Sequence, residues 1–406
     1  MAGHPMLSLE EAQAKLLSLV EPLPIERVDI EGALGRYLAE PMLARRTQPA
    51  ADVSAMDGYA VTAEDLTGPW HVVGESAAGH PYDSTVAPGQ AVRISTGALM
   101  PAGAEAVILQ EDLSREQHRI SLTGEAPIPA HKHIRHRGMD FPEGKEVLPL
   151  GVRIGSSQAA LAMAAGHKHL PVRRIPHLTV IDSGDELTSD PECCEPHQIP
   201  ASNGAMLAAM ARNLPVKVDR IGPVEDRLEA LVKAFQTAAD SDVIVTSGGA
   251  SVGEHDLVRP ALEAWGAKLD FWRVAIKPGK PILVARKAKG PRSQLVIGLP
   301  GNPVSSHITA YHFLLPVLRA LLGAARPTPM SMLALLTSPL PATGDRREFL
   351  RGVWDGENVT PQVVQDSGAL ASLAISNVLI DRPARAPVAG AGDPVRVYLL
   401  QNGGIA

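Results

Sequence analysis

The sequence of 406 residues contains few residues of several types, and each scarcity excludes a class of protein. Its two cysteines, Cys193 and Cys194, are neighbours and therefore offer neither a disulfide framework nor a CxxC zinc site. Aromatic residues make up 3% of the chain, so small aliphatic side chains must fill the core. No stretch approaches the ~20 apolar residues that a membrane-spanning helix needs. The N-terminus lacks the basic start and apolar block of a signal peptide, so we expect a cytoplasmic protein.

Positive charge is also scarce. The formal net charge is -6 and the isoelectric point is near 6.2, which argues against a nucleic-acid partner. With 45% hydrophobic residues the chain is globular, and its length exceeds what one hydrophobic core usually supports. We therefore expect two to four domains.

Local patterns suggest how these domains follow one another. Ser8 and Glu11 have capping-box spacing before a helical leucine pattern, which predicts a helix over about 9–20. Short β-like runs broken by Gly and Pro follow up to about residue 150, and SSQAALAMAAG predicts a helix that closes on Gly166. We expect an N-terminal region over 1–170 with an inserted β subdomain at about 46–145, an α/β domain over 171–325, and a β domain over 326–406.

The central segment is the clearest. From Leu178 to Gly323 strand-like and helix-like runs alternate, which predicts a largely parallel sheet with helices on both faces. In such sheets ligands bind beyond the carboxyl ends of the strands. Glycine-rich loops between Asp242 and Pro303 lie at such ends, which predicts a binding site there.

The first loop follows the apolar run DVIVT. Ser247, Gly248 and Gly249 allow backbone N–H groups to converge on an anion such as phosphate, although ordinary turns also use this string. Glu254 and Asp256 stand beyond the glycines, where a carboxylate could hold a divalent cation. Asp256 is equally suited to be the N-cap of the next helix.

Two further loops continue the pattern. KPGKP places Lys277 and Lys280 on either side of a turn, which suits a polyanion or simply a charged surface. In GLPGNP, Pro303 can start a helix, and Asn302 is either its N-cap or a ligand contact.

Acidic and histidine clusters have similar alternatives. Asp185 and Glu186 in SGDEL could hold a metal or serve acid–base chemistry, or they could form a solvated turn. Asp57 in SAMDGYA and Asp140 in RHRGMD, taken alone, read as turns. The HKHIRHR run contains three histidines, His131, His133 and His136. They could form a transition-metal site, or they could lie on a solvated basic strand.

Together these motifs form a recognisable series. SAMDGYA, RISTGALMPAGAEAVILQED, RHRGMD, SGDEL, TSGGASVGEHD, KPGKP and GLPGNPVSS occur in this order. The series resembles the molybdopterin molybdenumtransferase family, also called the MoeA family, which is similar to the C-terminal domain of gephyrin. The resemblance extends from the first helix to the C-terminal β domain.

The resemblance implies a fold and a reaction. Family members combine an N-terminal region bearing an inserted β domain, a three-layer α/β molybdopterin-binding domain and a C-terminal β barrel, and they form elongated homodimers. They insert molybdenum from molybdate into adenylylated molybdopterin and release AMP, with Mg²⁺ as the usual cation. Their cleft lies between the α/β domain of one subunit and N-terminal β elements of the other.

The resemblance also implies site residues. The positions matching catalytic ones are Asp57, Asp140, Glu186, Asp256, Lys277 and Lys280, and Glu186 and Asp256 are the expected metal ligands. The expected substrate-binding residues are Thr96, Ser247, Gly248, Gly249, Ser251, Pro300, Asn302 and Ser372, with Asn203 carried over less directly. The lysines would neutralise molybdate, and a dithiolene handoff to Cys193 and Cys194 has no support in the sequence.

Two other functions fit parts of this picture. A molybdopterin adenylyltransferase would resemble the middle segment alone, whereas a non-catalytic dimeric scaffold could keep the whole fold. Partner proteins under the family reading would be that adenylyltransferase and molybdoenzyme apoproteins or their chaperones.

Overall fold

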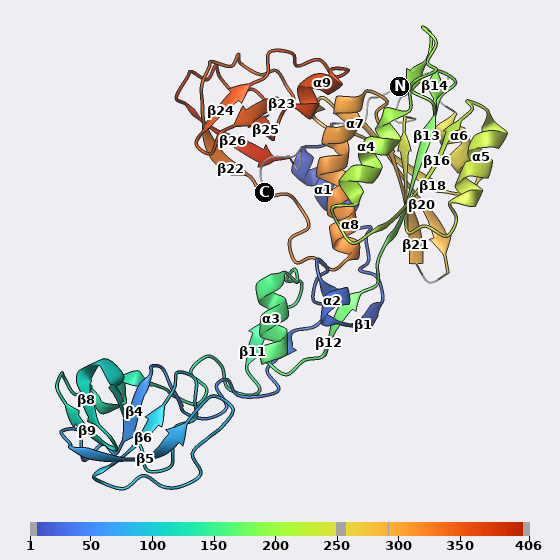
Figure 1. The fold of residues 1–406 in the computed structure, drawn as a ribbon. Helices are drawn as coiled ribbons and strands as arrows, with labels where there is room; N and C mark the ends of the chain where they lie inside the picture. The colour runs from blue at the N-terminus through green and yellow to red at the C-terminus, as the bar shows by residue number, and fades with distance from the viewer. Residues whose placement is uncertain (1–5, 249–256, 291, 401–406) are drawn as a thin grey trace.

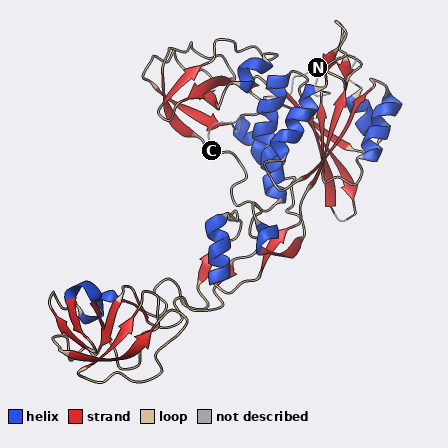
Figure 2. Ribbon diagram, viewed as in Figure 1, coloured by secondary structure: helices blue, strands red, loops and turns tan. Residues whose placement is uncertain are grey.

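The computed structural model describes residues 6–248, 257–290 and 292–400. It shows an elongated molecule in which a small β subdomain lies far from the other domains (Figure 1). Strands dominate the two outer parts and helices gather around the central sheet (Figure 2). Among the described residues, no helix is both long enough and apolar enough to cross a membrane.

The central domain is a three-layer α/β structure, as expected. Its six-stranded sheet has the order β16-β13-β17-β21-β20-β18, in which the first four strands are parallel and only β20 runs in the opposite direction, pairing antiparallel with both β21 and β18. The strands are β13 (His177–Ser183), β16 (Lys217–Val224), β17 (Val243–Ser247), β18 (Lys268–Arg273), β20 (Pro281–Lys289) and β21 (Arg292–Leu299). A short parallel pair, β14 (Leu187–Thr188) and β15 (Ile199–Pro200), projects from it.

Helices cover both faces of this sheet (Figure 1). Neighbouring residues of a strand point to opposite faces, so Val180 packs with one helical layer and Ile181 with the other. One layer holds α4 (Ser202–Ala211), α7 (Pro303–Thr309), a π-helical segment (Ala310–Leu314) and α8 (Leu315–Leu321). The other layer holds α5 (Leu228–Thr237) and α6 (Val258–Ala264).

The first helix, α1 (Leu9–Leu17), belongs to the core of this central domain. The expected capping box is present, because the Ser8 hydroxyl accepts from the Glu11 N–H and the Glu11 carboxylate accepts from the Ser8 N–H. Leu9 and Leu16 are buried in the same core as β13 and α8. The first described helix is thus packed against the π-helical segment and α8, which lie about 300 residues later in the sequence.

The chain enters and leaves the N-terminal region through one strand pair. β1 (Ile25–Asp29) pairs antiparallel with β12 (His169–Arg173), so the chain between them begins and ends at neighbouring points. The elements beside this pair are α2 (Ile30–Ala33), β2 (Met42–Leu43), β11 (Glu146–Leu148) and α3 (Ser156–Ala164). The helix α3 is the one expected before Gly166, whose φ of +89° ends it.

The distal β subdomain has its own small core. Its six-stranded sheet has the order β7-β4-β6-β5-β9-β8 around the buried Trp70. The strands are β4 (Gly58–Val61), β5 (Trp70–Ser76), β6 (Gln90–Ile94), β7 (Ala106–Leu109), β8 (Leu113–Glu116) and β9 (Arg119–Leu122). A second pair, β3 (Val53–Ser54) with β10 (Ile134–Arg135), and the 3₁₀ turns Gln110–Asp112 and Ala130–His133 complete it.

The C-terminal domain is the expected closed barrel. β23 pairs with both β24 and β25, which closes the ring, and β19 (Ile276–Lys277) adds to β23 from outside. The barrel consists of β22 (Met332–Leu336), β23 (Arg347–Trp354), β24 (Asn358–Pro361), β25 (Val378–Arg382) and β26 (Pro394–Leu399), with α9 (Leu370–Ala374) beside it. Because β19 belongs to the KPGKP segment, that loop lies between the central domain and the barrel.

Candidate functional site

A cavity of about 330 Å³ opens at the carboxyl ends of β13 and β17. Ser183, Glu186, Ser247 and Gly248 line it from the strand ends, as the sequence predicts for an open α/β sheet. Gly248 has a φ of +111°, which favours glycine. Its N–H donates to the Leu299 carbonyl, so this amide already has an acceptor.

The N-terminal turn of α4 forms the opposite wall of this cavity. Ser202 and Asn203 line it, and the first amide groups of a helix have no acceptor within the helix. The Asn203 side-chain amide donates to the Gly301 carbonyl at 2.7 Å, which ties α4 to the GLPGNP loop. The sequence analysis identified Asn203 as a candidate site residue, but it did not identify the N-terminal amide groups of α4 as hydrogen-bond donors.

Asp182 lies at the base of the cavity and is 2% exposed. Burial raises the pKa of this carboxyl group, and the contacts with Arg220, Ser247 and the Gly204 N–H oppose that rise. The ion pair to Arg220 measures 3.4 Å. A buried carboxyl group, tied to both β13 and α4, therefore holds two walls of the cavity together.

Three carboxyl groups gather at the rim. The Asp185 carboxylate accepts from the Asp226 N–H at 3.0 Å. Burial raises the pKa of Asp226, and the charges of Asp185 and then Glu186 raise it further. This repulsion marks a concentration of negative charge beside the cavity. The sequence analysis did not predict Asp226 as a site residue, because it lies in a segment that the sequence pattern predicts as a helix.

A second cavity, of about 380 Å³, contains the KPGKP turn. Lys277 and Lys280 line it, together with Arg346 and Glu348 from the barrel domain. The Lys277 ammonium pairs with Glu348 at 3.0 Å. Gly279 closes the turn with a φ of +105°, and a Cβ there would lie 2.5 Å from the Thr309 hydroxyl. The turn is therefore packed tightly on α7, with both lysines exposed above it.

The GLPGNP loop separates the two cavities. Asn302 occupies the N-cap position of α7, but its side chain makes no cap bond and donates to the Ser367 hydroxyl at 3.1 Å. Ser367 lines the lysine cavity and Gly368 lines the strand-end cavity, so the two cavities adjoin. Pro300 lies in this loop outside the lining of either cavity.

Other expected residues lie elsewhere. Ser372 is buried, where its hydroxyl accepts from Arg351 at 3.1 Å and donates to the Val364 carbonyl, so it supports the barrel. Asp57 and Thr96 contact each other in the distal subdomain, through bonds of 2.6 and 3.0 Å to the Asp57 carboxylate. Both hydrogen bonds lower the pKa of Asp57, and the bond from the Thr96 N–H has the larger effect.

Within one chain Asp57, Thr96 and Asp140 do not line the cavities that contain Glu186 and the lysines. Asp140 is exposed near the base of the β subdomain, where its N–H donates to the Gln48 carbonyl at 3.1 Å. Gly249, Ser251, Glu254 and Asp256 lie outside the described residues.

The histidine and cysteine clusters form no metal centre in the described part of the chain. No group of three or more His, Cys, Asp or Glu side chains there could hold a metal ion. His136 pairs with Asp52 at 3.0 Å, and the rings of His131 and His136 lie 5.5 Å apart. Cys193 and Cys194 are exposed, and the Cys194 thiol donates to the Gln198 carbonyl.

The three-layer fold, with cavities at the strand ends, defines an α/β protein of a ligand-binding type, and comparison with family models identifies which type. The MoeA N-terminal region (domains I and II) matches residues 7–166, a probable molybdopterin-binding domain matches 179–320, and the MoeA C-terminal region (domain IV) matches 334–400. The chain belongs to the MoeA family, and relatives of this chain are named molybdopterin molybdenumtransferases.

Individual relatives specify the family further. A molybdopterin molybdenumtransferase from Nostoc is 31% identical over 98% of this chain and 94% of its own length. Another from Haemophilus influenzae is 33% identical over 86% of each chain. The crystal structure of a molybdopterin biosynthesis MoeA protein from Pyrococcus horikoshii superimposes with a TM-score of 0.83 at 26% identity, covering 98% of this chain and all of the other. The family expected from the motifs is confirmed.

Proposed function

We propose that this chain transfers molybdenum from molybdate to adenylylated molybdopterin, releases AMP, and acts as a Mg²⁺-assisted homodimer. One observation carries the proposal: a cavity of strand ends and carboxylates adjoins a cavity of paired lysines. The first suits a phosphorylated organic substrate and the second a small dianion. Their shared wall, which includes Ser367 and Gly368, would bring the two substrates together.

In this proposal the strand-end cavity holds the pterin nucleotide. The first turn of α4 supplies amide groups and a favourable helix dipole for a phosphate. Asn203 is already held by the Gly301 carbonyl and orients that turn. Asp182 keeps α4 and β13 in register beneath the substrate.

The described carboxylates at the rim form no complete cation site by themselves, but their negative charge would attract a hard divalent cation. Burial, and then the charges of Asp185 and Glu186, raise the pKa of Asp226, and oxygen ligands are those that Mg²⁺ prefers. We assign the cation to Glu186, together with Asp256, which lies outside the described residues. When bound, it would offset the negative charge that develops on the phosphates as AMP leaves.

The lysine cavity would bind molybdate. Lys280 has no ion-pair partner among the described residues, whereas Lys277 shares its charge with Glu348. The rigid turn places both ammonium groups on one side, and Arg346 adds a third cation. Three cationic side chains against the carboxylates of Glu348 and Asp366 leave the cavity with a net positive charge, as a dianion requires.

The direct test is to incubate the protein with adenylylated molybdopterin, molybdate and Mg²⁺ and to measure AMP release and cofactor formation. We expect both products to depend on all three components. If neither product forms, the proposal is wrong. AMP transfer from ATP to molybdopterin would point instead to an adenylyltransferase, and an inactive but dimeric protein to a scaffold.

A substitution tests the lysine cavity. Lys280→Gln removes the uncommitted ammonium group, so kcat/KM for molybdate should fall by about 10- to 100-fold, which corresponds to about 1.4–2.8 kcal/mol. Lys268→Gln is the matched control, because Lys268 is exposed on β18 and lines neither cavity. Equal activities of the two variants would refute the role of Lys280.

A further inference from the structure

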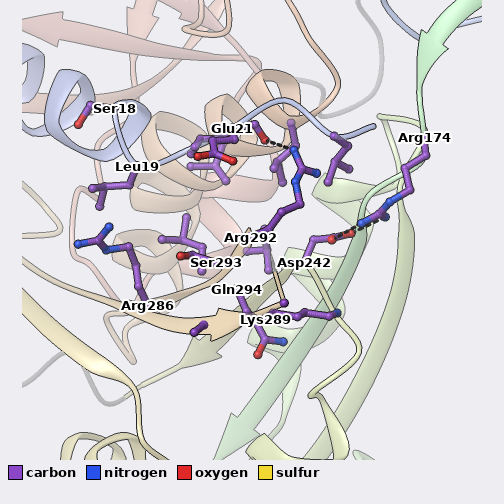
Figure 3. A pocket seen from close by; sticks show the side chains of 18 residues that line it. Ser18, Leu19, Glu21, Arg174, Asp242, Arg286, Lys289, Arg292, Ser293 and Gln294 are labelled. Carbon is purple, nitrogen blue, oxygen red and sulfur yellow. Dashed lines mark hydrogen bonds and ion pairs between the residues drawn. The ribbon is translucent and has the colours of Figure 1, made fainter. Parts of the chain in front are cut away.

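Two crossings of the chain join the central domain to the N-terminal region, residues 18–24 on the way out and residues 174–176 on the way back. Both crossings border a cavity of about 420 Å³ at the edge of the central sheet where β13 and β17 begin (Figure 3). Leu23 lines this cavity from the outgoing crossing and Arg174 lines it from the returning one. Because empty space offers no packing on this side, other contacts have to hold the crossings in place.

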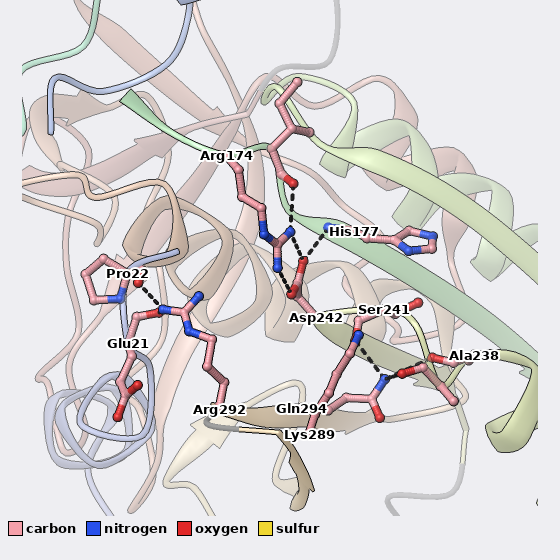
Figure 4. Close-up of polar contacts among 12 residues, drawn as sticks. Glu21, Pro22, Arg174, His177, Ala238, Ser241, Asp242, Lys289, Arg292 and Gln294 are labelled. Carbon is pink, nitrogen blue, oxygen red and sulfur yellow. Dashed lines mark hydrogen bonds and ion pairs between the residues drawn. The ribbon is translucent and has the colours of Figure 1, made fainter. Parts of the chain in front are cut away.

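The returning crossing is clamped by Asp242 (Figure 4). The Arg174 guanidinium donates to both oxygens of Asp242, at 2.8 and 2.5 Å, and the His177 N–H donates to the same carboxylate at 2.8 Å. Burial by itself would raise the pKa of Asp242, but these hydrogen bonds outweigh it and lower the pKa. Asp242 is therefore ionised, and its forked pair with Arg174 restrains direction as well as distance.

Asp242 is itself held in place by the neighbouring strands. The carbonyl of Ser241, next to it, accepts from the Gln294 side chain at 2.8 Å and from the Lys289 ammonium at 3.1 Å. Gln294 is buried and also donates to the Ala238 carbonyl at 2.9 Å, so it fixes the turn that leads into β17. The clamp is therefore built on the fixed start of a central strand.

The N-terminal region holds the same crossing from its own side. The Arg173 carbonyl accepts from the buried Arg36, which also pairs with Glu26 of β1. Arg36 and Glu26 belong to the N-terminal region, whereas Asp242 belongs to the central sheet. The adjacent residues Arg173 and Arg174 are thus held by different domains, so the two domains meet at this point of the chain.

The outgoing crossing is attached through backbone groups alone. Arg292 donates through Nη2 to the carbonyls of Glu21 and Pro22, and its buried Nη1 has no partner in the described chain. Among the described residues, the pair of Arg174 and Asp242 is the one ion pair between either crossing and the central domain.

Two further contacts limit the separation of the domains without fixing their angle. Tyr37 packs in the main core, and the Ala325 N–H, after α8, donates to the Gly151 carbonyl at 3.2 Å. Apolar packing is non-directional, and a single hydrogen bond permits rotation about its own axis. The forked pair at Arg174 is therefore the contact best suited to set the angle between the domains.

We propose that the Arg174–Asp242 pair is a positioning element that sets the angle between the N-terminal region and the central sheet. Its importance for catalysis rests on the function proposed above. The distal β subdomain lies far from this junction (Figure 1), so a small rotation at the junction becomes a large displacement of Asp57. In a shared cleft that displacement moves Asp57 relative to Glu186 of the partner subunit, and an error of about 1 Å can cost about 100-fold in rate.

The angle is measured by double electron–electron resonance in the full-length protein. One spin label is placed at Lys145→Cys in the N-terminal region and the other at Lys233→Cys on α5, since both lysines are exposed. The exposed native thiols are removed by Cys193→Ser and Cys194→Ser. Dilution with unlabelled protein restricts the measured distances to one subunit.

Substitutions in this labelled protein test the clamp. Asp242→Asn keeps an acceptor for the His177 N–H but loses the charged fork, so the distance distribution should widen about twofold. Arg174→Lys keeps the charge without the fork and should give an intermediate width. The control Arg385→Gln breaks an exposed ion pair with Asp345 in the barrel domain and should keep the original width. An unchanged width in Asp242→Asn, or an equal widening in Arg385→Gln, would overturn the proposal.

Activity tests the consequence for catalysis. The kcat for AMP release by Asp242→Asn should fall about tenfold, whereas the KM for molybdate should stay within about twofold, because the central domain and the barrel alone form the lysine cavity. A wider distance distribution with an unchanged kcat would overturn the positioning role. Absence of AMP release from the wild-type protein would refute the proposed function instead, and the distance measurement would still decide whether the pair sets the angle.

Discussion

At the scale of single residues, the close contact between Asp182 and Gly204 determines how α4 meets the sheet. A Cβ on Gly204 would lie 1.8 Å from an oxygen of the Asp182 carboxylate, closer than any real contact. The absence of a side chain lets the helix end approach the buried carboxyl group. Because Ser202 and Asn203 lie on the same turn, this contact also positions the proposed phosphate donors.

Gly204→Ala should therefore destabilise the central domain. Either α4 or the buried carboxyl group must move, and overpacking of this kind costs about 1–3 kcal/mol in the free energy of unfolding. Urea unfolding of the two proteins measures the difference. Gly344→Ala is the matched control, because nothing lies within 4 Å of its added Cβ, and its effect should stay within about 0.5 kcal/mol.

The sequence could predict the parts of the site that are local along the chain. Gly248, Gly301 and both lysines lie where strand–loop patterns place them, at strand ends and in a turn. Asp226 escaped prediction because its neighbours Asp185 and Glu186 are brought to it only by the pairing of β13 with β16. The arrangement of Asp57, Asp140 and Glu186 in one cleft remains a prediction that rests on the family resemblance.

At the scale of elements, the long helix after Pro303 contains a π-helical segment that the sequence does not reveal. The segment Ala310–Leu314 interrupts the helix and turns His312 into an aromatic cluster with Phe349 and Tyr398. Both ring nitrogens of His312 are buried without a hydrogen-bond partner among the described residues. Burial lowers the pKa of His307 to about 4 and that of His312 to about 3.

These histidines should make the protein sensitive to acid. A histidine in the unfolded chain titrates near pH 6.5, so below that pH the unfolded state binds protons that the folded state does not. Stability should fall as the pH decreases from about 6.5 to 4. His312→Phe should reduce this loss by about 2–3 kcal/mol, as measured by urea unfolding between pH 7 and 4.5.

The exposed His118 provides the comparison for this measurement, since His118→Phe should leave the pH dependence unchanged. Identical pH profiles for the two variants would contradict a burial effect at His312. The helix itself was predictable because Pro303 begins it and apolar residues continue it. Its register was not, because the π segment depends on packing against β23 and β26 from the barrel.

At the scale of the whole molecule, the elongated shape separates residues that the proposed reaction needs together. The distal β subdomain holds Asp57, whereas Glu186 lies beside the central sheet (Figure 1). A homodimer can place the same patch of one subunit against the cleft of the other. The fold of each domain was predictable from its strand and helix periodicity, but the distance between domains depends on tertiary packing that no local pattern encodes.

Mixing two inactive variants tests this shared cleft. Asp57→Asn and Glu186→Gln should each abolish AMP release, and co-refolded equal mixtures should recover about one quarter of the wild-type activity. Half of the dimers would then be mixed, and each mixed dimer would have one intact cleft. Two variants of one residue, Glu186→Gln with Glu186→Ala, provide the control without recovery. An inactive first mixture with confirmed mixed dimers would show that one chain supplies both residues.

The packing of α1 under α8 has a consequence for the order of synthesis. The Gln13 side chain donates to the His312 carbonyl, and Leu9 and Leu16 are covered by residues about 300 positions later in the chain. At translation rates of about 5–20 residues per second, the first helix waits about 15–60 s for its partner. During that interval the distal β subdomain can already fold, whereas the apolar face of α1 stays available to chaperones.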